Sequence, residues 1–325
     1  MRTTRRAALG LVPALAGLVA RPAAAQADYP NRPVRLVVPF VAGGSVDLLS
    51  RAVAQVLGRE LGQSIVVENR PGGTTVIGTT QVARAAPDGY TLLAGGDSVE
   101  LNRYLMPSLP YDPERDLAPV LQLADVPYVL LVNNGLPVHS LRELIAHAKA
   151  RPGELTYASF GMGGAGHLSG ELLTRMAGIE MLHVPYAGNP PALIDVVAGR
   201  VAMMFCTIPV AQSELQSGRV RPIAMSSAQR VKALPEVPTL AEAGLPGYES
   251  VSSMVLYAPR ATPPAIIGRL NAATRKVMAD PDFVRLVEGQ GFVLAPPRSP
   301  EETAARIRTH SAKWAEVIRA AGIRL

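Results

Sequence analysis

Short apolar runs and amphipathic segments alternate along the chain. Residues 34–38 form a β-rich run that stops at Pro39, and apolar positions at helical spacing follow over residues 48–57. The alternation continues to two well-marked helices that begin near Thr262 and Ser299. Such alternation is typical of an α/β fold, in which a parallel sheet carries helices on both faces. The sequence therefore predicts an α/β protein.

The first 27 residues have the pattern of an export signal. A basic start precedes an uncharged stretch at residues 7–20, and small residues of the A-x-A type follow. The apolar run has about 14 residues, whereas a bilayer-spanning helix needs about 20. The paired arginines also match a twin-arginine signal weakly. We therefore expect cleavage near Gln26 or Asp28 and a periplasmic or secreted mature protein.

Composition narrows the function classes. A chain of 325 residues suggests about two domains, and its single cysteine excludes an internal disulfide. The net charge of +6 includes four arginines of the export signal, so the mature chain has 28 basic and 26 acidic residues. Without a block of like charge, and with 5% aromatic residues, nucleic acid is not an expected partner. Beyond the signal, no apolar stretch reaches 18 residues, so no membrane span is expected.

Three loops follow predicted strands and precede predicted helices. They cover residues 40–47, 95–98 and 159–167. Ligands of α/β proteins bind at the carboxyl ends of strands, and pockets favour the interface between two domains. These loops are therefore the candidate ligand-binding segments, and we expect them to line a cleft.

The first loop contains two adjacent glycines where a strand becomes a helix. Gly43 and Gly44 allow close backbone approach, and the helix N-terminus offers N–H groups to a carboxylate or phosphate. The alternative is a tight turn in which Ser45 only caps the helix. Asp47 would repel an anion, so it fits a helix-start residue or a contact to an amine. Both interpretations of the loop stay open.

The third loop reads G-x-G-x-x-G over Gly161–Gly166, the pattern of a dinucleotide-binding loop. That interpretation needs an acidic residue at the end of the next strand, where the chain has His183 to Tyr186 instead. We therefore favour a second anion-accepting helix N-terminus facing the first, and retain a secreted NAD(P)-dependent enzyme as the alternative. His167 begins a helix beside this loop. No zinc, nucleophile-elbow or Walker A motif occurs, so no metal, cofactor or catalytic residue is expected.

Short motifs spread through the whole mature chain carry a family resemblance. They are Tyr29-Pro30, Val38-Pro-Phe40 with Gly43-Gly44, Ala86-Pro-Asp-Gly-Tyr-Thr-Leu92, His167-Leu with Gly170-Glu171, His183-Val-Pro-Tyr186 and Ala243-Gly-Leu-Pro-Gly-Tyr248. Their order and spacing resemble the Bug-type solute-binding receptors of tripartite tricarboxylate transporters, which are periplasmic proteins that capture small carboxylates.

The resemblance implies a type II periplasmic-binding-protein fold. Two α/β domains would be joined by two crossover segments, with the ligand cleft between the domains. Residues 28–129 with 253–325 would form the first domain, and residues 130–252 the second. It further implies a receptor rather than an enzyme, expected as a monomer without a cofactor. Such a receptor holds a mono- or dicarboxylate through backbone N–H groups and waters for a membrane permease.

Departures from the family pattern leave the ligand open. Cys206 stands where the family usually has aspartate, and Asp97 is a candidate for the missing negative charge. An amino acid or an aromatic acid therefore stays among the candidate ligands. The predicted ligand-binding residues are Phe40, Val41, Gly43, Gly44, Ser45, Asp47, Gly96, Asp97, Ser98, Ser159, Gly163, Gly164, His167, Tyr186, Asn189 and Cys206.

Overall fold

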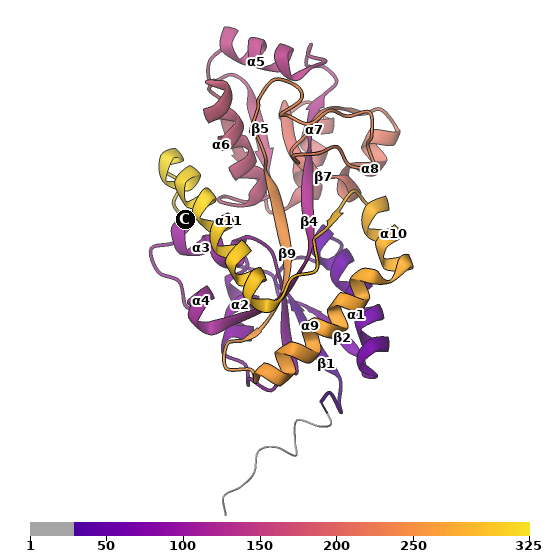
Figure 1. Ribbon diagram of the computed structural model, residues 1–325. Helices are drawn as coiled ribbons and strands as arrows, with labels where there is room; N and C mark the ends of the chain where they lie inside the picture. The colour runs from indigo at the N-terminus through magenta and orange to yellow at the C-terminus, as the bar shows by residue number, and fades with distance from the viewer. Residues whose placement is uncertain (1–28) are drawn as a thin grey trace, which may run out of the picture.

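The structure is a computed structural model that describes residues 29–325 (Figure 1). The predicted export signal and its cleavage site lie outside these residues. Strands and helices alternate through most of the described chain, as the sequence predicts. The strands join into one ten-stranded sheet with the main order β2-β1-β3-β9-β4-β7-β5-β6, and β8 and β10 both pair with β4.

One half of the sheet is built mainly from the N-terminal part of the chain. Strand β1 pairs in parallel with β2 and β3, and β3 pairs antiparallel with β9. The strands of this half are β1 (Val34–Val38), β2 (Ile65–Asn69), β3 (Thr91–Gly95), β9 (Val251–Pro259) and β10 (Val293–Leu294). Its helices are α1 (Ser45–Leu61), α2 (Val76–Ala83), α3 (Ser98–Leu105), α4 (Pro113–Asp116), α9 (Pro264–Ala279) and α10 (Pro281–Gly289).

The other half comes from the middle of the chain. Strand β5 pairs in parallel with β6 and β7. The strands here are β5 (Thr156–Ser159), β6 (Leu182–Pro185), β7 (Met203–Thr207) and β8 (Val220–Met225). The helices are α5 (Leu141–Ala150), α6 (Ala165–Ala177), α7 (Asn189–Val197) and α8 (Ile208–Gln216).

Strand β4 (Leu117–Asn133) runs through both halves, and in Figure 1 it lies beside β9 along the long axis of the molecule. Its residues up to Pro127 pair with β9, whereas those from Tyr128 pair with β7 and β8. The change of partner falls between Pro127 and Tyr128, close to the predicted domain boundary at residues 129 and 130. The chain returns to the first half through β9. Just before β9 begins, Ser250 donates its N–H to the Ser226 carbonyl, which belongs to the second half.

The last helix, α11 (Pro300–Ala321), packs across the junction. Its Trp314 and Ile318 share a buried apolar cluster with Leu168 of α6 and Leu130 of β4. A separate cluster fills the other half around β1, α1 and α9. The C-terminal half of α11 therefore contributes to the core of the second half, although the predicted boundaries assign residues 253–325 to the first domain. Those boundaries stay a prediction.

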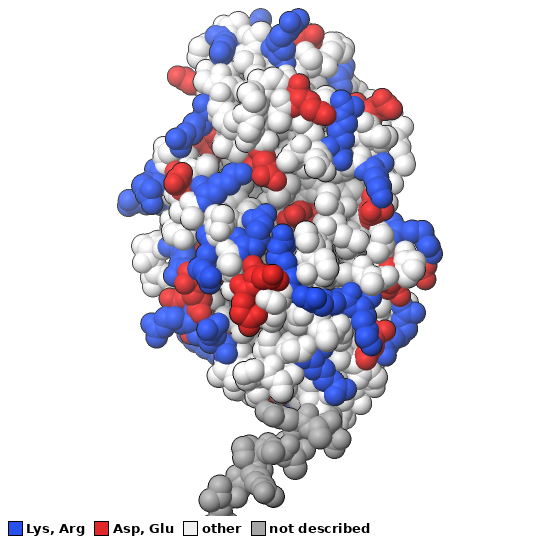
Figure 2. Space-filling model, viewed as in Figure 1, with Lys and Arg blue, Asp and Glu red and all other residues white. Residues whose placement is uncertain are grey.

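Charged side chains of both signs are spread over the surface. Figure 2 shows lysine and arginine interspersed with aspartate and glutamate over the face in view. Many form pairs, such as Arg103 with Glu114 and Lys232 with Glu288. Within residues 29–325, no helix combines the length and the apolar character needed to cross a membrane.

Candidate functional site

The two glycine loops of the sequence have nearly the same backbone. Gly43 and Gly163 adopt positive φ angles of 80° and 67°, which favour glycine. The next residues, Gly44 (φ −76°, ψ 167°) and Gly164 (φ −73°, ψ 168°), are the N-caps of α1 and α6, and no side chain caps either helix. The first N–H groups of a helix have no carbonyl partner within it. Both loops therefore present backbone donors at a helix N-terminus.

A side chain four residues on holds each loop. Gly43 donates its N–H to Asp47 Oδ2 at 2.9 Å, and Gly163 donates its N–H to His167 Nδ1 at 2.9 Å. Asp47 also accepts from Arg51 Nε at 3.0 Å and from Asn69 Nδ2 at 2.9 Å. Burial disfavours the charge of Asp47, but these three bonds outweigh it and lower the pKa of the carboxyl. Asp47 therefore lies in the first turn of α1 and binds the loop that precedes this helix.

Each glycine loop also meets an element of the other half. Ser45 Oγ donates to Thr207 Oγ1 at 2.8 Å, and both side chains are buried. A Cβ placed on Gly163 would lie 2.7 Å from Leu105 Cδ1 of α3. The loops therefore lie at the junction between the halves. Sequence reasoning missed Thr207, although its place between a β-run and a helix start was a usable signal.

Two histidines stack beneath the second glycine loop. The rings of His167 and His183 stack with centroids 3.8 Å apart and planes at 7°, and the Tyr157 ring lies 4.9 Å from His183 and 6.4 Å from His167. The Tyr157 hydroxyl donates to Glu171 Oε1 at 2.6 Å, and His183 Nε2 and Ser159 Oγ are hydrogen-bonded at 2.7 Å. Burial and the neighbouring His167 lower the pKa of His183 to about 4. The sequence motif contained His183, but nothing local placed it against His167.

The second predicted loop contributes through its backbone and Ser98. A Cβ on Gly96 would lie 3.3 Å from Phe40 Cζ, so Gly96 allows the half-buried Phe40 ring to pack against the loop. Ser98 Oγ accepts from Thr75 Oγ1 at 3.1 Å. These contacts bring the loops after β1, β2 and β3 together at one edge of the first half.

The loop after β2 was not among the predicted ligand-binding segments. Thr74 (φ 51°) and Thr75 (φ 78°) are left-handed, a conformation that β-branched residues rarely adopt. The buried Asn102 holds them there, because its Nδ2 donates to the Thr74 carbonyl at 2.8 Å. Backbone strain of this kind clusters at functional sites. The only sequence signal was the Pro-Gly-Gly run ahead of a predicted helix.

Two predicted ligand-binding side chains point away from the loops. Asp97 accepts the Ser253 N–H at 2.9 Å, and its Oδ2 lies 3.2 Å from His310 Nε2 of α11. Cys206 is fully buried with Met204 in an apolar cluster, and burial raises the pKa of its thiol to about 12. A ligand-binding role for these two side chains is therefore not supported by their positions.

Three predicted ligand-binding residues remain: Tyr186 and Asn189, which follow β6, and Val41, which lies in the first glycine loop. Tyr186 donates its N–H to the Ser159 carbonyl at 2.9 Å and its hydroxyl to Asp195 Oδ2 at 2.6 Å. Asn189 begins α7, and its buried Oδ1 has no hydrogen-bond partner among the described residues. Val41 is 52% exposed beside the first glycine loop. Of these three, only Asn189 has a buried polar atom left to bond.

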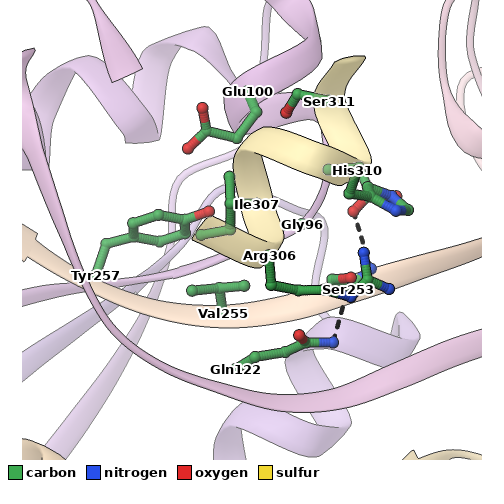
Figure 3. A pocket seen from close by; sticks show the side chains of 11 residues that line it. Gly96, Glu100, Gln122, Ser253, Val255, Tyr257, Arg306, Ile307, His310 and Ser311 are labelled. Carbon is green, nitrogen blue, oxygen red and sulfur yellow. Dashed lines mark hydrogen bonds and ion pairs between the residues drawn. The ribbon is translucent and has the colours of Figure 1, made fainter. Parts of the chain in front are cut away.

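A small cavity lined by both polar and apolar side chains lies between α11, β9 and the loop after β3. Figure 3 shows Glu100, Tyr257, Arg306 and His310 around it, and Gln122 Nε2 donates to Ser253 Oγ at 3.3 Å along its floor. Burial raises the pKa of Glu100 to about 7, an effect that Arg103 only partly offsets. Asp97 belongs to this cavity rather than to the glycine loops.

Glu100 should make the protein less stable as the pH rises. Its pKa is higher in the folded chain than in the unfolded one, so the folded chain binds more protons between about pH 4.5 and 7 and loses stability across that window. Replacing Glu100 with glutamine should therefore raise the free energy of unfolding by about 1–3 kcal/mol at pH 8 and change it little at pH 4.5. Urea unfolding at both pH values measures this. The exposed Glu154→Gln is the control, and an equal response of the two variants would contradict the prediction.

The fold has two α/β halves joined by a shared strand and a return crossover, with a helix N-terminus from each half at the junction. This arrangement defines a periplasmic binding protein of type II. The family model described as the tripartite tricarboxylate transporter family receptor matches residues 49–323. The chain therefore belongs to this family, whose members are solute-binding receptors of transport systems rather than enzymes. This result excludes the NAD(P)-dependent enzyme as the function of the Gly161–Gly166 loop.

Individual relatives are similar over nearly the whole chain. Protein BugT of Bordetella pertussis is 39% identical over 323 residues, covering 98% of both chains. Among solved structures, Rpa4515 of R. palustris with adipate is 38% identical with a TM-score of 0.85, covering 91% of this chain and 99% of that one. MatC of Rhodopseudomonas palustris with bound malate is 33% identical with a TM-score of 0.81, covering 89% of this chain and all of that one.

Proposed function

We propose that this receptor binds a small mono- or dicarboxylate between its two glycine loops. The observation that carries the proposal is the matched geometry of the N-termini of α1 and α6. Each helix N-terminus combines unpaired N–H donors with a partial positive charge, which favours a carboxylate. The two loops come from opposite halves and lie at the junction, so one ligand carboxylate or two can be held there. Relatives solved with adipate and with malate support this ligand class.

A simple carboxylate suits the site better than an amino acid. The ammonium group of an amino acid needs an acidic partner, and Asp97 and Cys206 were the predicted candidates. Asp97 is occupied by Ser253 and His310, and Cys206 is in the core. Both carboxylate oxygens of Asp47 already accept hydrogen bonds, from Gly43, Arg51 and Asn69. An aromatic acid stays compatible, because the Phe40 ring lies against Gly96 and the Phe160 ring lies against Gly166 of the second glycine loop.

The transport setting completes the proposal. The signal pattern of residues 1–27 supports export to the periplasm, by the general or the twin-arginine route. The family supports delivery of the bound acid to a membrane permease of the tripartite tricarboxylate type. The receptor acts as a monomer and uses no cofactor. Two domains, residues 28–129 with 253–325 and residues 130–252, close over the ligand by a hinge motion at the crossovers.

A thermal-shift screen tests the ligand class. The mature protein is heated with adipate, malate, benzoate, glutamate or NAD at equal concentration. A ligand that binds only the folded chain adds about 2.7 kcal/mol of stability at one hundred times its Kd, so a carboxylate of the right class should raise the Tm by several degrees. Stabilisation by NAD and by none of the acids would contradict the proposal.

A further inference from the structure

The turn between α10 and β10 in the first half covers the start of α8 in the second half. A Cβ placed on Gly291 of this turn would lie 2.4 Å from Cδ1 and 3.2 Å from Cβ of Ile208, the first residue of α8. Both residues are buried, and the preceding Thr207 accepts the hydrogen bond from Ser45 beside the first glycine loop. The start of α8 therefore touches the first half at the α10–β10 turn and at the first glycine loop.

The α10–β10 turn is a fixed part of the first half. Gly291 donates its N–H to the Glu288 carbonyl at 3.0 Å, and Phe292 donates its N–H to the Val287 carbonyl at 3.0 Å. Phe292 and Val287 belong to the buried apolar cluster of the first half, whereas Ile208 belongs to a cluster of the second half. The φ of Gly291 is 76°, a left-handed conformation that favours glycine. The contact therefore joins two surfaces that are each anchored in the core of their own half.

An ion pair between the halves lies close to this contact. Lys232 Nζ, from the segment after β8, lies 2.9 Å from both carboxylate oxygens of Glu288 on the last turn of α10. The side chain of Lys232 is 76% exposed, so the pair changes an equilibrium constant by at most about fivefold. Figure 1 shows α10 next to α8 on one side of the shared strands β4 and β9. The ion pair therefore supplements the buried apolar contact.

These contacts join elements that each belong to one half. Strand β4 pairs within both halves, whereas α8 packs in the core of the second half and α10 in that of the first. A rotation of the halves about the crossovers leaves the shared strands paired, but it separates surfaces that only touch. The Ile208–Gly291 contact and the Lys232–Glu288 pair therefore belong to the closed arrangement of the receptor.

We propose that Ile208 on Gly291, together with Lys232 and Glu288, forms a closure contact that holds the two halves together and raises ligand affinity from outside the ligand site. The statement about affinity rests on the proposed function, whereas the statement about closure does not. The apparent affinity of a receptor falls with the fraction of molecules in the binding-competent arrangement. A contact that favours the closed arrangement therefore strengthens binding without touching the ligand.

Closure is measured without ligand, as the distance between spin labels on Gln212→Cys of α8 and Arg285→Cys of α10. Both positions are exposed, and the fully buried Cys206 is not labelled. The labelled protein should show a population at the shorter, closed distance, and Gly291→Ala should reduce it about fivefold or more, because the added Cβ overlaps Ile208.

Gly218→Ala is the matched control for the closure measurement. Its φ of 66° strains a side chain as Gly291 does, but nothing lies within 4 Å of an added Cβ. The strain at either position is the same in the open and closed arrangements, so only the overlap at Gly291 changes their balance. An equal closed population in the two variants, or none in the labelled protein without either substitution, would overturn the proposal.

Binding is measured by calorimetry with adipate as the probe. Gly291→Ala should lower the affinity about fivefold or more relative to Gly218→Ala. Ile208→Val removes only Cδ1, the atom nearest to Gly291, and should lower the affinity about twofold to tenfold. Because neither residue lies in a glycine loop, the loss should appear as faster dissociation of adipate rather than slower association.

A charge exchange tests the ion pair separately. Lys232→Glu and Glu288→Lys should each lower the affinity for adipate about twofold to fivefold, since each places like charges together. The double variant should restore the wild-type affinity, because it rebuilds the pair with the charges exchanged. A double variant that binds no better than the single ones would overturn the role of this pair. Neither residue is buried, so this test remains if Gly291→Ala does not fold.

The measurements separate the possible failures. If adipate binds with equal affinity to the wild type, Gly291→Ala and Ile208→Val, the proposed control of affinity is wrong. If adipate and the other acids of the screen do not bind, the ligand class is wrong, and the spin-label distances alone decide whether the closure contact holds the halves together.

Discussion

Replacing Gly44 with valine is expected to lower the affinity for the bound carboxylate by about 10- to 100-fold, the loss of one charge-assisted hydrogen bond worth about 1.5–3 kcal/mol. Gly44 is the N-cap of α1, so a side chain there obstructs approach to the first N–H groups of the helix. Calorimetric titration with the acid identified by the thermal-shift screen measures the effect.

The fold should tolerate this substitution. Gly44 has a φ of −76°, which any residue adopts, and a Cβ there would meet only the Val41 carbonyl at 3.5 Å. Gly268→Ala is the control, because Gly268 lies on exposed α9 with open space around it. Gly199 is a poorer control, since its φ of 75° strains any side chain. Unchanged affinity in Gly44→Val would mean that the first loop is an ordinary turn.

Removing the carboxylate of Asp47 is expected to cost about 2–4 kcal/mol of stability, because a buried charge with several hydrogen bonds is lost. In Asp47→Ala, the Gly43 N–H and the Asn69 amide lose their acceptor and Arg51 loses its ion pair. Folding lowers the pKa of Asp47, so its contribution is complete above the unfolded value of about 4 and is lost as the pH falls through the folded pKa.

Urea unfolding at pH 7 measures the effect of Asp47→Ala. Asp282→Ala is the matched control, since Asp282 forms an i,i+3 pair with Arg285 in which both side chains are more than 70% exposed. Such surface pairs contribute at most about 1 kcal/mol. Equal stability losses in the two variants would show that Asp47 does not organise the first glycine loop.

The alternation of strands and helices could be predicted from the sequence, because each element depends on a local pattern of residues. The predicted strand run at residues 34–38 is β1, and the helix predicted to begin near Ser299 is capped by that serine. Hydrophobic periodicity and capping depend on near neighbours in the chain, so one sequence contains them.

Strand β4 shows where that local pattern fails. The uninterrupted apolar run at residues 129–132 predicts a short strand, whereas β4 spans 17 residues. Pro119 and Pro127 interrupt the sequence signal, because proline is uncommon within strands. Pairing with β9, about 130 residues further along the chain, holds the part of β4 up to Pro127 in the sheet, and such pairing is invisible to a local pattern.

The direction of side chains at the junction was also beyond the sequence. On β7, Cys206 and Thr207 point to opposite faces, since successive residues of a strand alternate. The candidate residue Cys206 therefore points into the core, whereas its neighbour Thr207 meets Ser45. A shift of one residue along a strand selects the opposite face.

The sequence by itself determined the α/β class, the presence of a helix after each glycine loop and the export-signal pattern, because each is set by residues close together in the chain. The helix caps at Gly44 and Gly164 came from the structure, since the sequence had suggested Ser45 as a cap and a start near His167. Only the tertiary structure decided which loops meet. The Ser45–Thr207 bond joins residues 162 apart, and the Asp97–Ser253 bond joins residues 156 apart. Such contacts depend on how the two halves of the sheet are connected through β4 and β9, and no pattern within either loop specifies that connection.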